Sequence, residues 1–145
     1  MAGPGPRRQA REAALQVLFA ADTGREVDAD SVFDEVLREF SLPQRAREHA
    51  LELVRGVAAN RKPIDEAISS CSTHWKVERL ATVDRNILRV ATYELLFEPS
   101  VPPEVVMDEA VEIARRFGGG PSPAFVNGVL DQIAKARAAQ QGEGP

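Results

Sequence analysis

Three arginines, Arg7, Arg8 and Arg11, gather at the start of the first stretch with helical periodicity. Cations at a helix N-terminus oppose the positive end of the helix dipole, so three of them need a compensating interaction. Phosphate groups supply one, because backbone N–H groups and guanidinium groups converge at such an end. The pattern therefore predicts a phosphate-binding surface, with a solvated charged helix end as the alternative.

A second unusual segment runs from Phe117 through the triple glycine 118–120 to Phe125. We expect the glycines to end a helix, because glycine tolerates the left-handed C′ conformation. Extra glycines also let a backbone approach a ligand closely. Phe125 lies at the edge of the next apolar stripe, where its ring is placed to stack on an unpaired base, with Asn127 beside it to bind a base edge. The alternative is a flexible loop with Phe125 at the edge of the core.

The first expected helix also carries a second apolar face, formed by Leu15 and Phe19. Both residues point away from the centre of the main apolar stripe, which lies between Val17 and Leu18. An exposed aromatic residue on a helix is a typical anchor of a protein interface. The sequence thus leaves two interpretations open: a docking face for another protein, or coverage of both residues by a second helix of the same bundle.

Asp84 stands at the start of a later expected helix, with Thr82 as its expected N-cap. A carboxylate in that position is favoured by the helix dipole. This stabilising role is one interpretation of Asp84, and an acidic contact for a basic partner is the other.

The sequence contains no signature of an enzyme or of a cofactor site. It lacks the phosphate-binding GxxxxGK[ST] loop, a GxGxxG after a strand, HExxH and GxSxG. Cys71 is the only cysteine, so neither an internal disulfide nor a CxxC metal site can form. It continues an apolar stripe and is expected to be a core thiol. We therefore expect no catalysis, no cofactor and no metal, in the reducing environment of the cytoplasm.

Composition narrows the class of protein further. The 145 residues are 43% hydrophobic and 28% charged, which excludes a disordered tail. No apolar run is long enough to span a membrane, and the interrupted apolar stretch after Arg8 does not resemble a secretory signal. The formal net charge of −4 excludes a protein that coats nucleic acid indiscriminately, so any such binding must use a local patch.

Every long segment has apolar residues at helical spacing, and none alternates with the period of a strand. The apolar stripes cover residues 10–21, 32–40, 46–57, 64–71, 87–95, 106–117 and 126–133. The predicted fold is all-α, with about seven helices in two small helical-bundle subdomains. The turn 60–63 sets the expected boundary, with residues 1–60 carrying the basic first helix and residues 61–145 ending in a frayed tail from about 138.

Three stretches, residues 7–19, 83–96 and 103–131, together resemble the NusB transcription antitermination family in order and spacing. The resemblance spans nearly the whole chain. Its most specific part is the run Phe125-Val126-Asn127-Gly128-Val129-Leu130-Asp131.

This resemblance implies an all-helical, non-catalytic protein that binds the boxA element of nascent ribosomal RNA leader transcripts together with NusE. NusA, NusG and RNA polymerase then complete the antitermination complex. The RNA-facing positions of the family are matched by Arg7, Arg8, Arg11 and Phe125. Asn127 lies two residues after Phe125 in the specific run and is expected to contact RNA as well. Phe19, with Leu15 beside it, and Asp84 match positions on the NusE side. Since the chain is acidic, NusE is expected to add positive surface and make RNA binding cooperative.

Two other hypotheses use the same residues differently. In the first, the chain is a helical interaction module that forms a homodimer through the Leu15–Phe19 face and has no RNA role. In the second, it is the NusB-like domain of an RNA methyltransferase. Such an enzyme needs a Rossmann-type domain and a catalytic cysteine downstream, and the sequence up to Pro145 contains neither.

Overall fold

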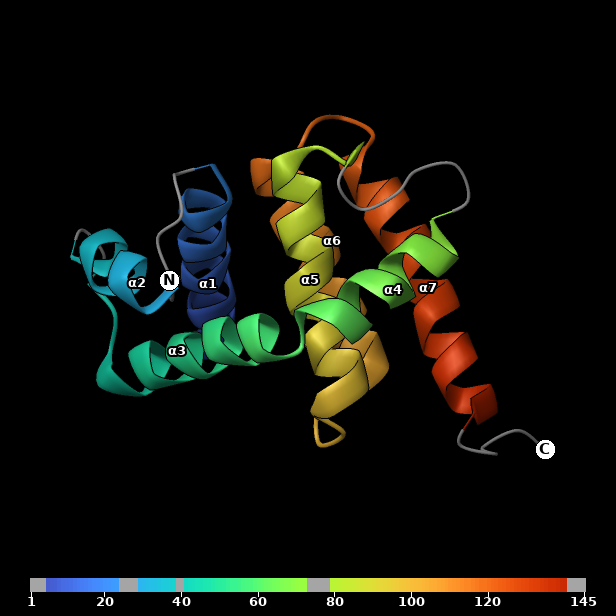
Figure 1. Ribbon diagram of the computed structural model, residues 1–145, viewed down its shortest axis with the longest axis horizontal. Coiled ribbons are helices and arrows are strands. Elements are labelled where there is room, and N and C mark those ends of the chain that lie inside the picture. Colours follow the sequence, from blue (N-terminus) through green and yellow to red (C-terminus); the bar gives the residue numbers. More distant parts are fainter. Residues whose placement is uncertain (1–4, 24–28, 39–40, 73–78, 141–145) are drawn as a thin grey trace. The chain divides into compact units, whose positions relative to one another are not determined.

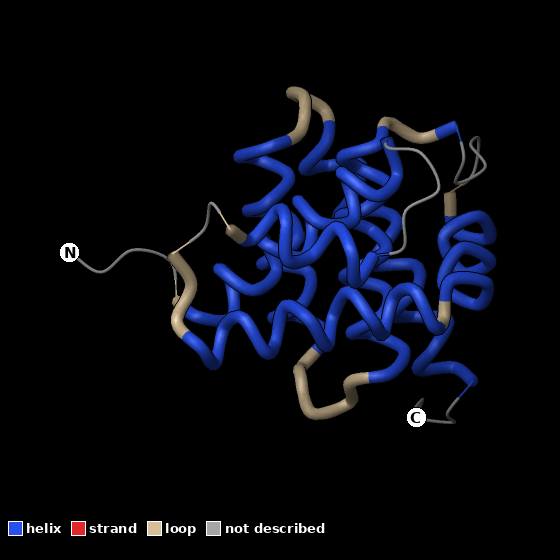
Figure 2. Tube along the Cα trace, turned by 60° about the vertical axis from the view of Figure 1, so that its left-hand side comes forward, coloured by secondary structure: helices blue, strands red, loops and turns tan. Residues whose placement is uncertain are grey.

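The computed structural model describes residues 5–23, 29–38, 41–72 and 79–140. Within these ranges the chain forms seven α-helices and no strand, which confirms the all-α prediction (Figures 1 and 2). The helices are α1 (Pro6–Thr23), α2 (Ala29–Leu37), α3 (Gln44–Ala59), α4 (Arg61–Cys71), α5 (Thr82–Phe97), α6 (Pro103–Phe117) and α7 (Ser122–Gln140).

The N-terminal end of α1 and the C-terminal end of α7 lie near the two ends of the described chain. Helix α1 begins at Pro6, a residue suited to the first helical position because its missing N–H would have no intrahelical partner there. Helix α7 continues to Gln140, so the tail expected from about residue 138 is still helical at that point. Residues 141–145 lie outside the described part of the chain.

The chain divides into two units, Met1–Ala59 and Asn60–Pro145. In the first unit, α1 packs against both α2 and α3. The apolar stripes of these helices are buried as their spacing predicts, because one face of each helix must leave water when the three pack together. Buried residues of this unit include Ala10, Ala14, Val17, Leu18, Phe33, Leu37, Leu53, Val54 and Val57.

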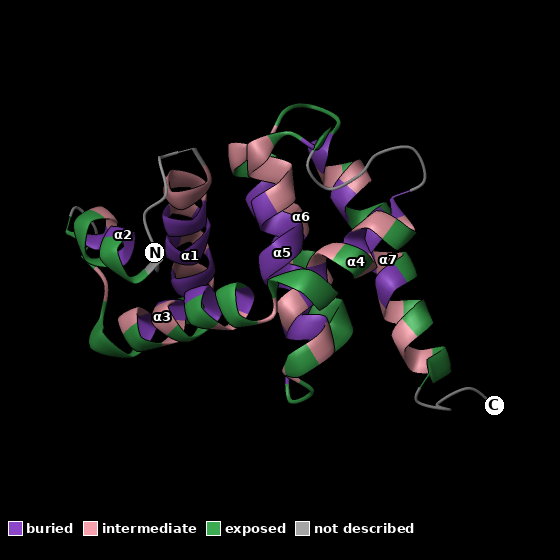
Figure 3. Cartoon of the chain, viewed as in Figure 1, coloured by how far each residue is buried: buried purple, intermediate pink, exposed green. Residues whose placement is uncertain are grey.

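In the second unit, α5 is a central element, since α4, α6 and α7 all pack against it. Buried residues run along much of its length (Figure 3). They include apolar residues of the predicted stripe, such as Leu88 and Leu95, but also the polar side chains of Asn86, Arg89 and Glu94. Polar groups at this depth destabilise a fold unless they are paired.

The guanidinium of Arg89 meets this requirement through Asp65 on α4. Its Nε and Nη2 atoms donate to the two carboxylate oxygens at 2.9 and 3.0 Å, while Nη1 lies 3.4 Å from Asn86 Oδ1. The Asn86 amide in turn donates to the carbonyl of Thr82 at 2.9 Å, in the first turn of α5. Arg61 adds a second cation 3.4 Å from Asp65. This network fixes α5 on α4.

We predict that Asp65→Ala destabilises the protein by about 3–5 kcal/mol, because it removes the carboxylate that pairs with a guanidinium only 5% exposed. Denaturant unfolding followed by far-UV circular dichroism measures this loss. Asp131→Ala is the matched control, since Asp131 forms an exposed pair with Lys135 and its loss is expected to cost under about 0.5 kcal/mol. Equal losses of stability in the two variants would show that the buried Arg89–Asp65 pair stabilises the fold no more than an exposed pair does.

Candidate nucleic-acid interface

The start of α1 presents its arginines at three different depths. Arg7 is exposed, Arg8 is half-buried and Arg11 is only 4% exposed. Arg11 is covered along with its apolar neighbours, so of the three arginines predicted to bind phosphate it offers the least surface. In this structure the surface available to an anion consists of Arg7, Arg8 and the first N–H groups of α1.

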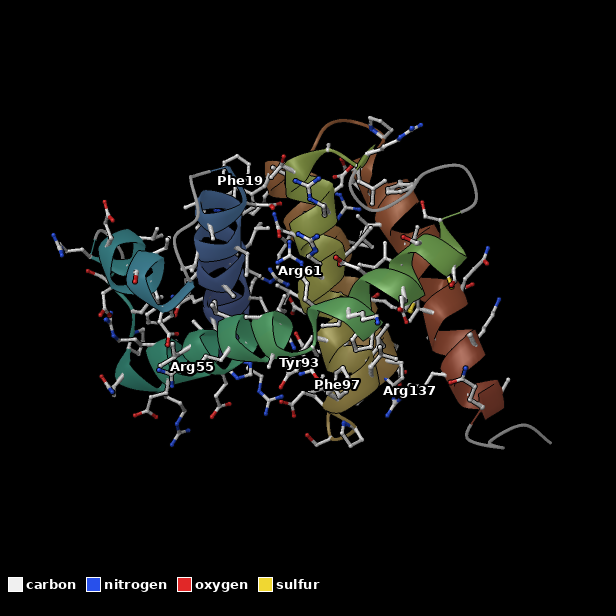
Figure 4. The ribbon with its side chains drawn as sticks, viewed as in Figure 1. Phe19, Arg55, Arg61, Tyr93, Phe97 and Arg137 are labelled. Carbon is white, nitrogen blue, oxygen red and sulfur yellow. The ribbon has the colours of Figure 1, made fainter. Side chains whose placement is uncertain are left out.

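The second face of α1 is also partly covered. Leu15 is 3% exposed, so it adds no open surface to the expected docking face, and the alternative that it is covered holds for this residue. Phe19, one turn further on, is half-buried near the C-terminal end of α1 (Figure 4). Of the two residues, Phe19 is the one that retains surface for a partner.

The turn between α6 and α7 depends on Gly118 for a reason other than the expected one. Gly118 has φ −95° and ψ 178°, an extended conformation that any residue adopts, so the left-handed prediction is wrong. A Cβ atom built on Gly118 would lie 2.6 Å from both Cβ and Oγ of Ser122, and 2.9 Å from the Ala114 carbonyl oxygen. Glycine is required because the start of α7 packs directly against the end of α6.

This turn forms one wall of a pocket of about 330 Å³, and the start of α5 forms the other. The pocket joins residues that the sequence assigned to separate ligands, because Phe125 and Asp84 both line it. Its lining residues are Arg79, Leu80, Ala81, Asp84, Pro121, Ser122 and Phe125.

Asp84 lies in the first turn of α5, where the helix dipole favours a carboxylate, in agreement with the first of its two interpretations. The N-cap of α5 is Ala81 rather than the expected Thr82, and it makes no side-chain capping hydrogen bond. The Oδ1 atom of Asp84 is buried, and no residue of the described chain donates a hydrogen bond to it. A buried acceptor without a donor is energetically unfavourable.

Phe125 and Asn127 lie in the first turns of α7. Phe125 is half-buried, with part of its ring in the pocket wall, and Asn127 is exposed. The predicted core-edge placement of Phe125 thus agrees with the structure. The arginines of α1 belong to the first unit, whereas this pocket belongs to the second unit.

The sequence did not reveal Arg79 and Ser122 as pocket residues. Arg79 precedes α5 outside any periodic segment, and Ser122 read only as an expected N-cap. Neither position carries a pattern that distinguishes a pocket residue from an ordinary loop residue. Only the packing of α7 against α5 brings them to one place.

The described residues were also compared with the requirements of a metal site, a membrane span and a reactive thiol. No group of three or more His, Cys, Asp or Glu side chains is placed there to hold a metal ion. None of the helices in those ranges is both long and apolar enough to cross a membrane. Burial raises the pKa of the Cys71 thiol, which disfavours the reactive thiolate.

Fold and surfaces together define a small all-helical binding protein of two units, with an arginine-bearing helix start and an aromatic pocket. The chain belongs to the NusB family, whose family model matches residues 8–135. The resemblance identified from the sequence is therefore confirmed.

Individual relatives agree over nearly the whole chain. The transcription antitermination protein NusB of Sorangium cellulosum is 49% identical over 131 residues, which cover 90% of this chain and 93% of the relative. The solved structure of T. maritima NusB is 44% identical, with a TM-score of 0.83 and 93% of each chain covered. A chain in the crystal structure of antitermination factors NusB and NusE in complex with dsRNA is 32% identical, with a TM-score of 0.83, covering 90% of this chain and 97% of that one.

We predict that Gly118→Ala destabilises the protein by about 1–3 kcal/mol, because the new methyl group overlaps Ser122 and forces α7 to shift. Thermal and denaturant unfolding measure the change. Gly120→Ala is the matched control, since a Cβ there meets nothing within 4 Å, and we expect stability equal to or slightly above wild type. If Gly118→Ala left stability unchanged, the short distance between Gly118 and Ser122 would not require glycine at this position.

Proposed function

We propose that this protein is a transcription antitermination factor that binds the boxA element of nascent ribosomal RNA leader transcripts together with NusE. In this role it supports transcription of ribosomal RNA operons in the cytoplasm, alongside NusA, NusG and RNA polymerase. It performs no catalysis and uses no cofactor. Its contribution is to hold RNA and a protein partner at once.

Membership of the NusB family is the observation that carries this proposal. Relatives that match over about nine tenths of both chains are named transcription antitermination proteins. The solved complex of NusB, NusE and dsRNA, whose matching chain has the same fold, supports RNA and NusE as ligands. These relatives favour the antitermination role over a methyltransferase domain or a module without RNA.

The geometry of the first unit suits contact with an RNA backbone. Arg7 is exposed beside the first N–H groups of α1, where a phosphate gains both hydrogen bonds and a favourable dipole. Arg8 follows it and is half-buried. Arg11 is only 4% exposed and offers little surface to an RNA backbone. A phosphate at this position relieves the repulsion between two neighbouring cations and the helix dipole.

In the second unit, the ring of Phe125 offers a stacking surface for an unpaired base, and the exposed amide of Asn127 offers hydrogen bonds. Such contacts read bases, whereas the arginines position the backbone. The net charge of −4 opposes binding to RNA at long range, so NusE contributes by adding positive surface to the complex.

We predict that the double change Arg7→Ala and Arg8→Ala weakens boxA RNA binding while the fold stays intact. Each lost phosphate contact lowers the slope of log affinity against log salt by about 0.7 for single-stranded RNA. Filter binding in the presence of NusE at several salt concentrations measures both quantities. Arg11 is left unchanged because removing a buried guanidinium would lower stability.

The control for this prediction is Arg38→Ala with Arg45→Ala, which removes the same charge from exposed positions of the same unit. We expect this variant to keep the wild-type salt slope. If the two double variants behave alike, α1 does not contact phosphates.

We predict that Phe19→Asp abolishes NusE association without unfolding the protein, because it places a charge on the remaining apolar surface of α1. Isothermal titration calorimetry with NusE measures the loss. Phe97→Asp is the control, since Phe97 is 41% exposed at the end of α5, where it stacks on Tyr93 at 5.7 Å (Figure 4). Wild-type affinity of the Phe19 variant for NusE would exclude α1 as the docking helix.

A further inference from the structure

The turn between α5 and α6 carries apolar side chains that the fold leaves exposed to water (Figures 1 and 3). Phe97 at the end of α5 and Val105 at the start of α6 are the two large hydrophobic residues exposed in the described ranges, at 41% and 40%. Pro99, Pro102 and Pro103 are exposed between them. Single exposed apolar residues are normal on any protein, but such a concentration within one turn is typical of an interaction surface. We refer to residues 97–105 as the α5–α6 turn.

Contacts within the second unit hold the α5–α6 turn in place. The ring of Phe97 stacks on Tyr93 with 5.7 Å between the ring centroids, and the Tyr93 hydroxyl donates to Glu98 Oε1 at 3.3 Å (Figure 4). Val101 is only 9% exposed, and its N–H donates to the Glu98 carbonyl at 3.1 Å. The prolines add to this order because each fixes its own φ angle. A surface that is formed in advance loses little conformational entropy when a partner binds.

The charge beside the α5–α6 turn is negative. Residues 97–114 include five acidic side chains and no lysine, arginine or histidine. Asp108 is exposed on the same side of α6 as Val105, three residues before it, and as the exposed Glu104, one turn before it. The helix dipole accounts for a carboxylate at Glu104, in the first turn, but not at Asp108. Neither carboxylate forms an ion pair with another residue of the described ranges.

These charges distinguish between classes of ligand. Exposed carboxylates repel the phosphates of RNA and of anionic lipids. Lysine and arginine side chains of another protein are attracted to them, and their aliphatic stems pack well on apolar surface. The surface is also separate from the pocket that contains Phe125, because the two lie at opposite ends of α6, a helix of 15 residues and about 20 Å.

We propose that the α5–α6 turn and the adjacent acidic side of α6 dock a basic segment of a protein other than NusE. Lysine or arginine side chains of that segment pair with Glu104 and Asp108, while an apolar side chain packs on Phe97 or Val105. The proposal rests on the function proposed above, in which the chain acts inside a complex that contains further proteins.

Site-specific photocrosslinking tests this assignment. The full chain carrying Phe97→p-benzoylphenylalanine is assembled with NusE, boxA RNA, NusA, NusG and RNA polymerase and irradiated, and mass spectrometry identifies the crosslinked segment. We expect a segment rich in lysine or arginine from one of the proteins other than NusE. The control is Gln132→p-benzoylphenylalanine at an exposed position of α7, which should give only background crosslinking.

Charge reversal provides the second measurement. Glu104→Lys with Asp108→Lys, added to the crosslinking chain, should lower the yield about tenfold, because like charges facing each other weaken an interface. The affinities for boxA RNA and NusE should stay at the level of the unreversed chain. Glu48→Lys with Glu52→Lys is the matched control, since it makes the same charge change four residues apart at exposed positions of α3. It should leave the crosslink unchanged.

A crosslink from position 97 to RNA, to NusE, to a second copy of the chain or to a segment without basic residues would overturn the proposal. Crosslinking no stronger than that of the Gln132 control would do so as well, as would equal yields in the two charge-reversed chains. Binding of boxA RNA is measured in the same samples. If the wild-type chain with NusE does not bind this RNA, the proposed function fails, whereas intact RNA binding without the expected crosslink removes only the docking surface.

Discussion

The buried ion pair between Arg89 and Asp65 is the constraint on which the second unit depends. Burial of a guanidinium that is 5% exposed is costly, so the Asp65 carboxylate presented by α4 stabilises the position of α5. The geometry is bidentate, which fixes the rotation of α5 as well as its distance from α4. Through Asn86 the same network reaches the carbonyl of Thr82, and hence the first turn of α5.

That first turn is one wall of the pocket, and a steric constraint sets the other. At Gly118 the end of α6 meets Ser122 so closely that a methyl group does not fit, which holds the start of α7 in place. The first turns of α5 and α7, which carry Asp84 and Phe125, are therefore each held by a contact within the second unit. Sites built in this way keep their geometry without the ligand, and binding then costs little ordering of side chains.

Helical periodicity predicted the seven helices, the buried stripes and the edge position of Phe125, because each follows from spacing within one segment. It could not decide whether Arg11 and Leu15 are covered, since a helical wheel gives the direction of a side chain but not what covers a second face. It also missed the Arg89–Asp65 pair, whose members lie 24 residues apart on different helices. The role of Gly118 was misjudged because a local rule for helix ends was applied to a contact between two helices.

The crowding of positive charge at the start of α1 has a consequence for the dynamics of the free protein. No side chain in the first turn of α1 is acidic, so that turn lacks the favourable interaction between a carboxylate and the helix dipole. This turn opens more readily than the remainder of α1, and its amide protons exchange faster with solvent. An anion that seats there closes the turn, so ligand capture and local folding of the helix end are one thermodynamic event.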